Sequence, residues 1–271
     1  MTQTLSFQPF APDHLDGALR LSRAARWPHR AEDWGMVLLL SRGVVALDGG
    51  EVVATALATP FGDVAMVNMI IVDERMRGRG LGRQIMTRAM DLVSARNWRL
   101  VATPSGLPLY EKLGFEACGM VHQHQGPIAA VTAPTGITWA TAEDLPGIIA
   151  VDRATTGADR TALWQALAER GRIAHLPGKG AAALRPFGRG EVAGPVIAQD
   201  TGTARDLLAA LFAGRAGAFM RVDTTGMSGL EPWLAEIGLA EVDRGVAMQR
   251  GAPPATDGRF TRFALAAQAL G

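Results

Sequence analysis

Cysteine is almost absent from this 271-residue chain, in which Cys118 is the only one. A single cysteine excludes an internal disulfide and fits a reducing compartment, so we expect a cytoplasmic protein. No partner histidine is indicated for Cys118, and we expect it to be a small packing residue. Long apolar runs are missing too, since none approaches the ~18 residues of a membrane span. The N-terminus lacks the basic-then-apolar order of a signal peptide, so no membrane partner is expected.

An excess of charge of one sign is also missing. The 27 Lys and Arg residues nearly balance the 26 Asp and Glu residues, for a net charge of +1. This balance provides no global attraction to nucleic acid, and no basic stripe with aromatic platforms indicates such a partner. Tyrosine occurs once, as Tyr110. The hydrophobic share of 48% is typical of a core-forming protein of one large domain or two ordinary ones.

The most informative segment is a loop dense in glycine and arginine. It follows the apolar, β-branched run 64–72, which predicts a buried strand, and it precedes an amphipathic helix that starts near Leu81. Glycines let backbone amides approach a ligand closely, and the unpaired N–H groups of a helix N-terminus suit a phosphate. The segment therefore predicts a pyrophosphate site, the alternative being a surface turn with hydrated arginines.

Two common phosphate motifs do not fit the chain. The dinucleotide motif G-x-G-x-x-G requires a glycine three residues after Gly80, where Arg83 stands. The P-loop requires Gly-Lys-Ser/Thr, but Gly178 and Lys179 are followed by another glycine.

A third pattern does fit. The run Arg-x-x-Gly-x-Gly, from Arg77 to Gly82, resembles the acetyl-CoA loop of the GNAT N-acetyltransferases. Further along, the segment LYEKLGF at 109–115 is similar to the one that follows the fifth strand in that family. The two motifs in this order identify residues 1–130 as a member of the family.

The resemblance implies acetyl-CoA as cofactor and a set of residues that bind it. In the family the fourth and fifth strands splay apart, and pantetheine lies between them like an extra strand. The loop amides and arginines hold the pyrophosphate, and residues before the LYEKLGF segment contact the pantetheine arm. The implied cofactor residues are Ile70, Ile71, Val72, Arg77, Gly78, Arg79, Gly80, Leu81, Gly82, Arg83, Thr103, Ser105, Gly106 and Tyr110.

Tyr110 is the implied catalytic residue. Its family role is the general acid that protonates the departing CoA thiolate, for which a phenol of pKa ~10 is suited. The alternative is a ring that only packs and hydrogen-bonds the cofactor.

The general base is not identified. Some family members use a glutamate on the fourth strand, at the position of Met66 in this chain. Asn68, Asp63 and Glu74 are candidates for ordering a water that accepts the proton, although each also has a structural reading. Proton loss directly to water is the remaining alternative.

Further residues are candidates for the acceptor site. Trp27, His29 and Asp33 lie in the helical region that usually covers it, where aromatic and acidic groups suit an amine. His122 and His124 share one face of a predicted strand, which fits a cleft lining or a surface face. No third ligand accompanies them, so we expect no metal. The candidate substrate residues are Trp27, His29, Asp33, Asn68, His122 and His124.

The chain also contains an internal repeat. The segment 108–115 aligns with 232–239, and 126–136 reads as an uncharged linker, so we expect two domains, 1–130 and 131–271. The second copy has a shorter loop and places Leu234 opposite Tyr110, which indicates that it keeps the fold and has lost CoA binding. We therefore expect an α/β (α+β) protein of two tandem GNAT-like domains, each a mixed, mostly antiparallel sheet flanked by helices. Strands are expected at 5–10, 43–47, 51–58, 64–72, 99–103 and near 120–125, and helices at 13–25, 31–41, 81–96 and 107–113.

Together these features predict an acetyl-CoA-dependent N-acetyltransferase that acts on a small primary amine. The second half would shape the acceptor pocket or stabilise the first half. The alternative function is a non-catalytic acyl-CoA sensor. Whether the chain forms a homodimer is left open.

Overall fold

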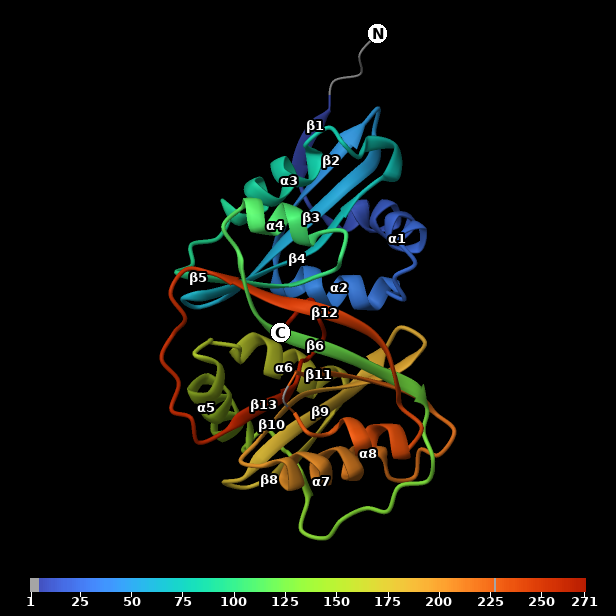
Figure 1. The fold of residues 1–271 in the computed structure, drawn as a ribbon, viewed down its shortest axis with the longest axis vertical. Coiled ribbons are helices and arrows are strands. Elements are labelled where there is room, and N and C mark those ends of the chain that lie inside the picture. Colours follow the sequence, from blue (N-terminus) through green and yellow to red (C-terminus); the bar gives the residue numbers. More distant parts are fainter. Residues whose placement is uncertain (1–4, 227) are drawn as a thin grey trace.

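The computed structural model describes residues 5–226 and 228–271, which form two halves stacked along the long axis of the molecule (Figure 1). The first half contains β1 (Ser6–Pro9), η1 (Pro12–His14), α1 (Leu15–Ala24), α2 (Ala31–Leu40), β2 (Arg42–Asp48), β3 (Glu51–Phe61), β4 (Val64–Val72), η2 (Glu74–Met76), α3 (Leu81–Met90), β5 (Asn97–Ala102), α4 (Leu107–Lys112) and β6 (Glu116–Pro127). The second half contains β7 (Thr138–Trp139), α5 (Leu145–Thr156), α6 (Thr161–Arg170), β8 (Arg172–Leu176), β9 (Gly180–Phe187), β10 (Gly190–Ala198), α7 (Thr201–Phe212), β11 (Phe219–Thr225), α8 (Glu231–Glu236), β12 (Ala240–Arg250) and β13 (Thr261–Ala264). The halves repeat one order of elements, which confirms the predicted duplication of a mixed sheet flanked by helices.

Local sequence explains most of these elements. Gly49 and Gly50 both have positive φ and allow the tight turn between β2 and β3. The continuous apolar run of β4 is buried on both faces up to Met69. Trp34 and Trp164, each the fourth residue of its helix, are fully buried in α2 and α6. They join one hydrophobic cluster that the helices of both halves share.

Several bounds predicted from the sequence were wrong in detail, and so was the environment expected for Cys118. Helix α3 ends at Met90 rather than at residue 96, because the amides of Leu92 and Val93 bond only three residues back and the helix tightens and stops. Strand β6 spans Glu116–Pro127 rather than about 120–125, so it begins earlier and the linker begins two residues later than expected. Strand β3 ends at Phe61 rather than at residue 58. Cys118 is exposed rather than packed.

Strands β4 and β5 separate along their length. They pair in parallel only where Val64–Met66 of β4 meets Asn97–Arg99 of β5. Beyond Met66 the main chain of β4 is paired with β3 alone, so one of its edges is free. This free edge opens into a groove that is the candidate site.

In the second half, the gap that corresponds to this one is filled. Strands β10 and β11 also pair in parallel over three residues, Glu191–Ala193 with Met220–Val222. Beyond that point β13 lies between them and pairs antiparallel with both. Gly194 permits the close approach of this segment, since a Cβ there would lie 1.9 Å from the carbonyl oxygen of Leu265. In the second half, β13 therefore fills the gap that stays open in the first half.

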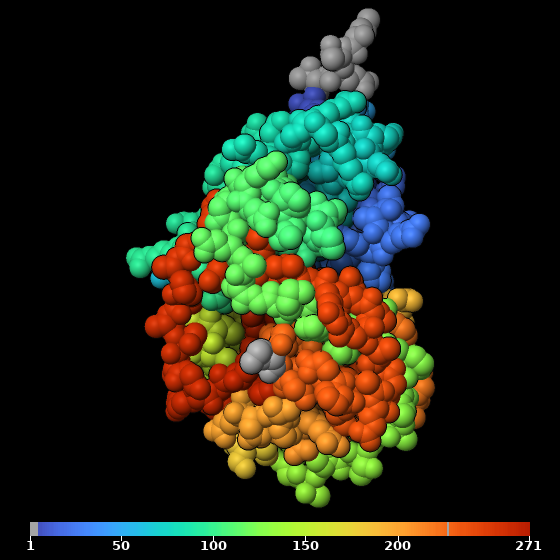
Figure 2. All heavy atoms as spheres, in the orientation of Figure 1, coloured from blue at the N-terminus to red at the C-terminus, as the bar shows by residue number. Residues whose placement is uncertain are grey.

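The two halves also exchange their last long strands. Strand β6 pairs with β11 of the second half, while β12 pairs with β5 of the first. β6 and β12 in turn pair antiparallel with each other, so one 13-stranded sheet runs through the molecule. In Figure 1 these two strands cross the middle, and Figure 2 shows red C-terminal residues beside green residues there.

Candidate active site

A groove of about 610 Å³ begins at the free edge of β4. Its walls are the end of β4, the Gly/Arg loop, the first turn of α3 and the segment that leads into α4. Of the predicted cofactor residues, the following line it: Ile70, Ile71, Val72, Arg77, Gly78, Gly80, Leu81, Gly82, Arg83, Thr103, Ser105, Gly106 and Tyr110. Arg79 does not line the groove; its Nη1 lies 3.9 Å from Sδ of Met76.

The loop backbone leaves this groove open. Gly78 and Gly80 have φ of 76° and 74°, a conformation that side-chain-bearing residues rarely adopt. A Cβ at either position would meet no atom within 4 Å, so the space beside the loop is empty. Gly80 is also the N-cap of α3 and has no side chain to cap the helix, which leaves the first amides of α3 free to bind an anion.

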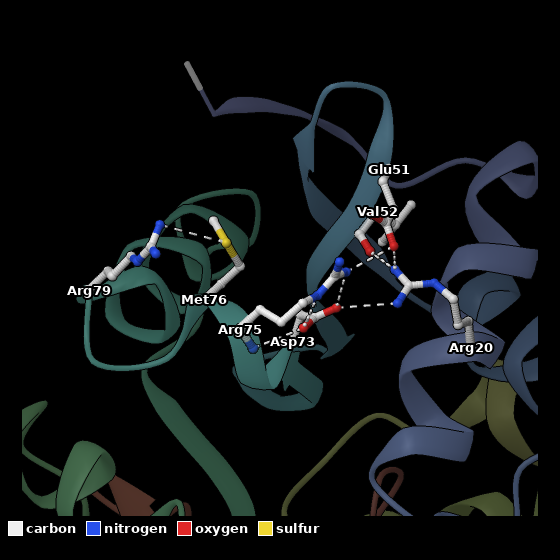
Figure 3. Close-up of polar contacts among 7 residues, drawn as sticks. All are labelled: Arg20, Glu51, Val52, Asp73, Arg75, Met76 and Arg79. Carbon is white, nitrogen blue, oxygen red and sulfur yellow. Dashed lines mark hydrogen bonds and ion pairs between the residues drawn. The ribbon is translucent and has the colours of Figure 1, made fainter. Parts of the chain in front are cut away.

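An ion-pair network holds the base of the loop (Figure 3). Asp73 accepts hydrogen bonds from the backbone amide and the guanidinium of Arg75, and its carboxylate lies 3.2 Å from Arg20 of α1. Glu51 at the start of β3 lies 2.9 Å from Arg20 and 3.0 Å from Arg75. The Arg75 guanidinium, together with Arg20, holds the pKa of Asp73 well below its usual range. Arg75 is therefore occupied, whereas Arg77 and Arg83 form no ion pair within the described residues.

A bulge bends β4 immediately before the groove. Met69 has φ of 49°, and the register between β3 and β4 shifts between Thr55 and Leu57. The buried hydroxyl of Thr55 donates to the carbonyl oxygen of Met69 at 2.7 Å and fixes this conformation. The bulge redirects the backbone that continues as Ile70–Val72 along the groove.

A second cavity of about 420 Å³ adjoins the groove. It lies between the halves, and its walls come from the α1–α2 connection, β4, β5, β6 and several segments of the second half. The second half contributes Phe187, Arg189, Arg221, Asp243 and Gln268. We call this cavity the acceptor cleft. Trp27, Ile70, Thr103 and Tyr110 line both it and the groove, so the two cavities meet at these residues.

Tyr110 is buried at this junction. Its ring packs edge-on against Phe115 and lies so close to Gly106 that a Cβ there would be 2.7 Å from Cε2 and 3.1 Å from the hydroxyl oxygen. Its hydroxyl bonds to none of the residues described. Burial raises the pKa of Tyr110 to about 12, so the phenol keeps its proton at neutral pH.

The acceptor cleft brings together half of the predicted substrate residues. Trp27, His29 and Asn68 line it. The side-chain amide of Asn68 donates to Thr59 and to the carbonyl oxygen of Ala269, so it also anchors the C-terminal turn. Asp33 is buried behind the cleft, where it binds Arg30 and the amide of Gly188 from the second half.

The structure does not bring His122 and His124 into the cleft. Alternation along β6 turns Gln123 and Gln125 toward it instead. His124 is 2% exposed, and His122 lies 3.3 Å from Glu241 of β12. The alternating pattern permitted either pair to face the site, and no signal in the sequence indicated which.

His29 is neutral in the cleft wall at neutral pH. Its ring contacts Trp27 and Phe187, with centroid separations of 5.5 and 5.3 Å. Burial, supported by the charges of Arg221 and Arg185, lowers the pKa of His29 to about 4 despite the opposing effect of Asp33.

Among the residues of the first half that the structure describes, no carboxylate lines the cleft. Met66 is 4% exposed and does not line it. Asp63 and Glu74 are exposed and lie outside both cavities. The acid that lines the cleft is Asp243, from β12.

Neither a metal cluster nor a membrane-spanning helix is found in the described residues. Within 5–226 and 228–271, no three His, Cys, Asp or Glu side chains are grouped as metal ligands. In the same residues, no helix combines the length and the apolar character needed to cross a bilayer.

Comparison with known proteins agrees with this geometry. Two models described as "Acetyltransferase (GNAT) domain" match residues 40–117 and 148–264. The chain is 29% identical to the uncharacterized N-acetyltransferase YitH of Bacillus subtilis (strain 168), over 96% of each chain.

Solved structures resemble the fold. A putative acetyltransferase from Pyrococcus horikoshii superposes with a TM-score of 0.86 at 17% identity, over 100% of this chain and 97% of the other. A GCN5-related N-acetyltransferase from Sphaerobacter thermophilus gives a TM-score of 0.61 at 19% identity, over 93% and 97%.

The splayed mixed sheet with a glycine-rich loop at the gap accompanies matches to acetyltransferase models in both halves, and together they assign the protein to the acyltransferases. The chain belongs to the GNAT acetyltransferase family, with two GNAT domains in tandem.

Proposed function

We propose that the protein transfers the acetyl group of acetyl-CoA to a primary amine, with Tyr110 as general acid. The observation that carries this proposal is the meeting of the groove and the acceptor cleft at Tyr110, between the separated strands β4 and β5. GNAT acetyltransferases generally use acetyl-CoA, and the groove has the features that this molecule requires.

The groove offers a specific set of contacts to acetyl-CoA. The free edge of Ile70–Val72 would pair with the amides of the pantetheine arm. The open loop amides and the free first turn of α3 would bind the pyrophosphate, with Arg77 and Arg83 adding charge-assisted hydrogen bonds. Thr103, Ser105 and Gly106 form the opposite wall, along the arm.

In each step of the proposed reaction, a particular part of the chain has a defined role. Acetyl-CoA supplies the acetyl thioester. The cleft holds the amine, whose nitrogen must lose a proton before it attacks, since a free amine has a pKa near ~10. The nitrogen then bonds to the carbonyl carbon of the thioester, the carbon–sulfur bond breaks, and Tyr110 donates its phenolic proton to the departing thiolate. The tyrosinate regains a proton from the positively charged nitrogen of the intermediate through water in the cleft. With Met66 buried at the position of the family glutamate, we propose that the amine proton leaves through water in the cleft.

We further propose one cofactor site per chain and the division 1–130 and 131–271. In the second half β13 occupies the gap between β10 and β11. Asp200 caps α7 by accepting from the amide of Thr203 at 2.7 Å, so a carboxylate stands where the first half leaves free amides. The second half would then contribute to the reaction by lining the acceptor cleft, without binding a cofactor of its own.

Replacing Tyr110 tests the catalytic proposal. For Tyr110→Phe we expect kcat to fall by about 10²-fold or more, because the general acid is lost. KM for acetyl-CoA should stay near the wild-type value, because the ring remains in place. Release of free thiol across an amine panel measures both quantities.

Two outcomes would contradict the proposal. An unchanged kcat for Tyr110→Phe would remove Tyr110 from the chemistry. CoA binding without turnover of any amine by the wild-type protein would favour the acyl-CoA sensor.

A further inference from the structure

The charged side chains of the acceptor cleft point to the class of amine that it accepts. We infer that the acceptor is a small primary amine that also carries an anionic group, a carboxylate or a phosphate. This inference rests on the proposed function and adds to it the chemistry of the second substrate.

Positive charge predominates in the lining of the cleft. Arg26, Arg189 and Arg221 line it together with one acid, Asp243, and Arg221 is paired with Asp223, which lies behind the lining. Arg26 and Arg189 form no ion pair and no side-chain hydrogen bond with any residue that the structure describes. Each of them is exposed, so their charges are available to a ligand.

Arg221 presents one free edge of its guanidinium. Its Nε and Nη2 donate to the buried carboxylate of Asp223 at 3.0 and 2.9 Å, which fixes the orientation of the group. Phe187 also lies against it, with the guanidinium carbon 5.3 Å from the ring centroid. Within the described part of the chain, its Nη1 has no partner. A guanidinium held in this way is suited to binding a carboxylate or phosphate oxygen.

Arg26 occupies a backbone position that disfavours arginine. The amides of Arg26 and Trp27 donate to the carbonyl oxygens of Arg23 and Ser22, the pattern of a helix C-terminus in which glycine is usual at this position. Arg26 has φ of 59° there. A positive φ at a residue other than glycine costs stability, and the place of Arg26 in the cleft lining supports a role in ligand binding.

The cleft also disfavours polycationic amines. Neutral His29 supplies no negative charge that would attract a polycation, and the guanidinium of Arg185 lies behind the cleft wall, 5.1 Å from the ring centroid of Phe187. A polyamine would place several ammonium groups among arginines of like charge. An anionic amine would instead direct its acidic group to the arginines and leave its nitrogen free for the junction at Tyr110.

Matched amines test this inference. Turnover is measured with L-phenylalanine, its amide and phenethylamine for the carboxylate, and with phosphoethanolamine and ethanolamine for the phosphate, with spermidine as the polycation. We expect kcat/KM to be at least about tenfold higher for the anionic member of one series, as one charge-assisted hydrogen bond implies. Equal or faster turnover of the uncharged members or of spermidine would overturn the inference.

Binding of the reaction products gives a second readout that does not require turnover. N-acetyl-L-phenylalanine and N-acetyl-phosphoethanolamine are titrated into the CoA-loaded protein, beside N-acetyl-phenylalanine amide and N-acetylethanolamine. Tighter binding of an acid than of its neutral counterpart supports the inference even if the proposed reaction fails. Equal affinities contradict it, whatever the turnover result.

Two variants test the arginines themselves. Arg26→Gly removes a charge and relieves the positive φ, so we expect its thermal midpoint to be unchanged or higher while KM for the anionic amine rises about tenfold. Arg189→Ala should raise the same KM. Arg96→Ala is the matched control, since Arg96 is 85% exposed and lies outside both cavities. A KM that none of these variants changes would overturn the assignment.

Discussion

Gly106 has no side chain, and this leaves room for the ring of Tyr110. Because a Cβ at residue 106 would lie 2.7 Å from the Tyr110 ring, we expect Gly106→Ala to displace the phenol. A displacement near 1 Å at a reacting group costs about 10²-fold in kcat. Gly35→Ala is the control, since a Cβ at Gly35 meets nothing within 4 Å and the change should stabilise α2 by about 0.5–1 kcal/mol. Wild-type turnover by Gly106→Ala would show that the position of the ring is not critical.

The ring of His29 links stability to pH. Its pKa is about 4 in the folded protein, against 6.5 for an unperturbed histidine, so the unfolded chain binds a proton first as the pH falls. The stability that comes from keeping His29 neutral is therefore fully present above about pH 6.5. As the pH falls toward 4, the free energy of unfolding decreases by up to about 3 kcal/mol, at about 1.4 kcal/mol per pKa unit. Urea denaturation at pH 7, 5.5 and 4.5 should show a smaller loss of unfolding free energy for His29→Gln than for wild type. Parallel pH profiles would contradict this reading.

At the scale of the element, the helices that follow β4 and β10 begin differently. The N-terminus of α3 opens onto the groove, whereas that of α7 is capped by Asp200 and lies beside a filled gap. Calorimetric titration with CoA should accordingly give one site per chain. Arg77→Ala and Arg83→Ala should each weaken that site by about tenfold or more, because each removes a charge-assisted hydrogen bond. Lys179→Ala, beside Asp200 in the second half, is the control; a stoichiometry of two would disprove the single-site proposal.

The same elements show how far local sequence determines structure. The apolar run of β4 predicted its bounds, and the alternating glycines predicted the open loop, because both patterns act over a few residues. The end of α3 was missed, since Leu92 and Val93 continue the apolar pattern after the hydrogen bonds have changed. The sequence also did not determine which face of β6 lines the cleft, because a strand has two faces and its neighbours β11 and β12 come from distant parts of the sequence.

At the scale of the whole molecule, the exchange of β6 and β12 makes each half incomplete alone. A fragment of residues 1–130 would lack the strand that pairs with β5 and would leave β6 without β11. We expect this fragment to fail to fold as a stable monomer, and co-expression with 131–271 to restore the complex and thiol release. Circular dichroism and gel filtration measure the first outcome, and the thiol assay measures the second.

A chain cleaved in the exposed linker near residues 132–136 is the control for this experiment. All pairings survive such a cut, so activity should persist. A folded, active fragment 1–130 would show that the exchange is dispensable. Neither the exchange nor the position of β13 was predicted, because pairing between distant strands leaves no local pattern in either segment.

The filled gap of the second half has a consequence for how such a chain changes over generations. A duplicated domain whose own ligand site is closed is normally free to be deleted. Here deletion would remove β12, the neighbour of β5, and the part of the acceptor-cleft lining that the second half contributes. Under the proposed single-site function, selection for activity in the first half also maintains the second half, and substitutions in β12 are constrained by the groove and the cleft that it helps to form.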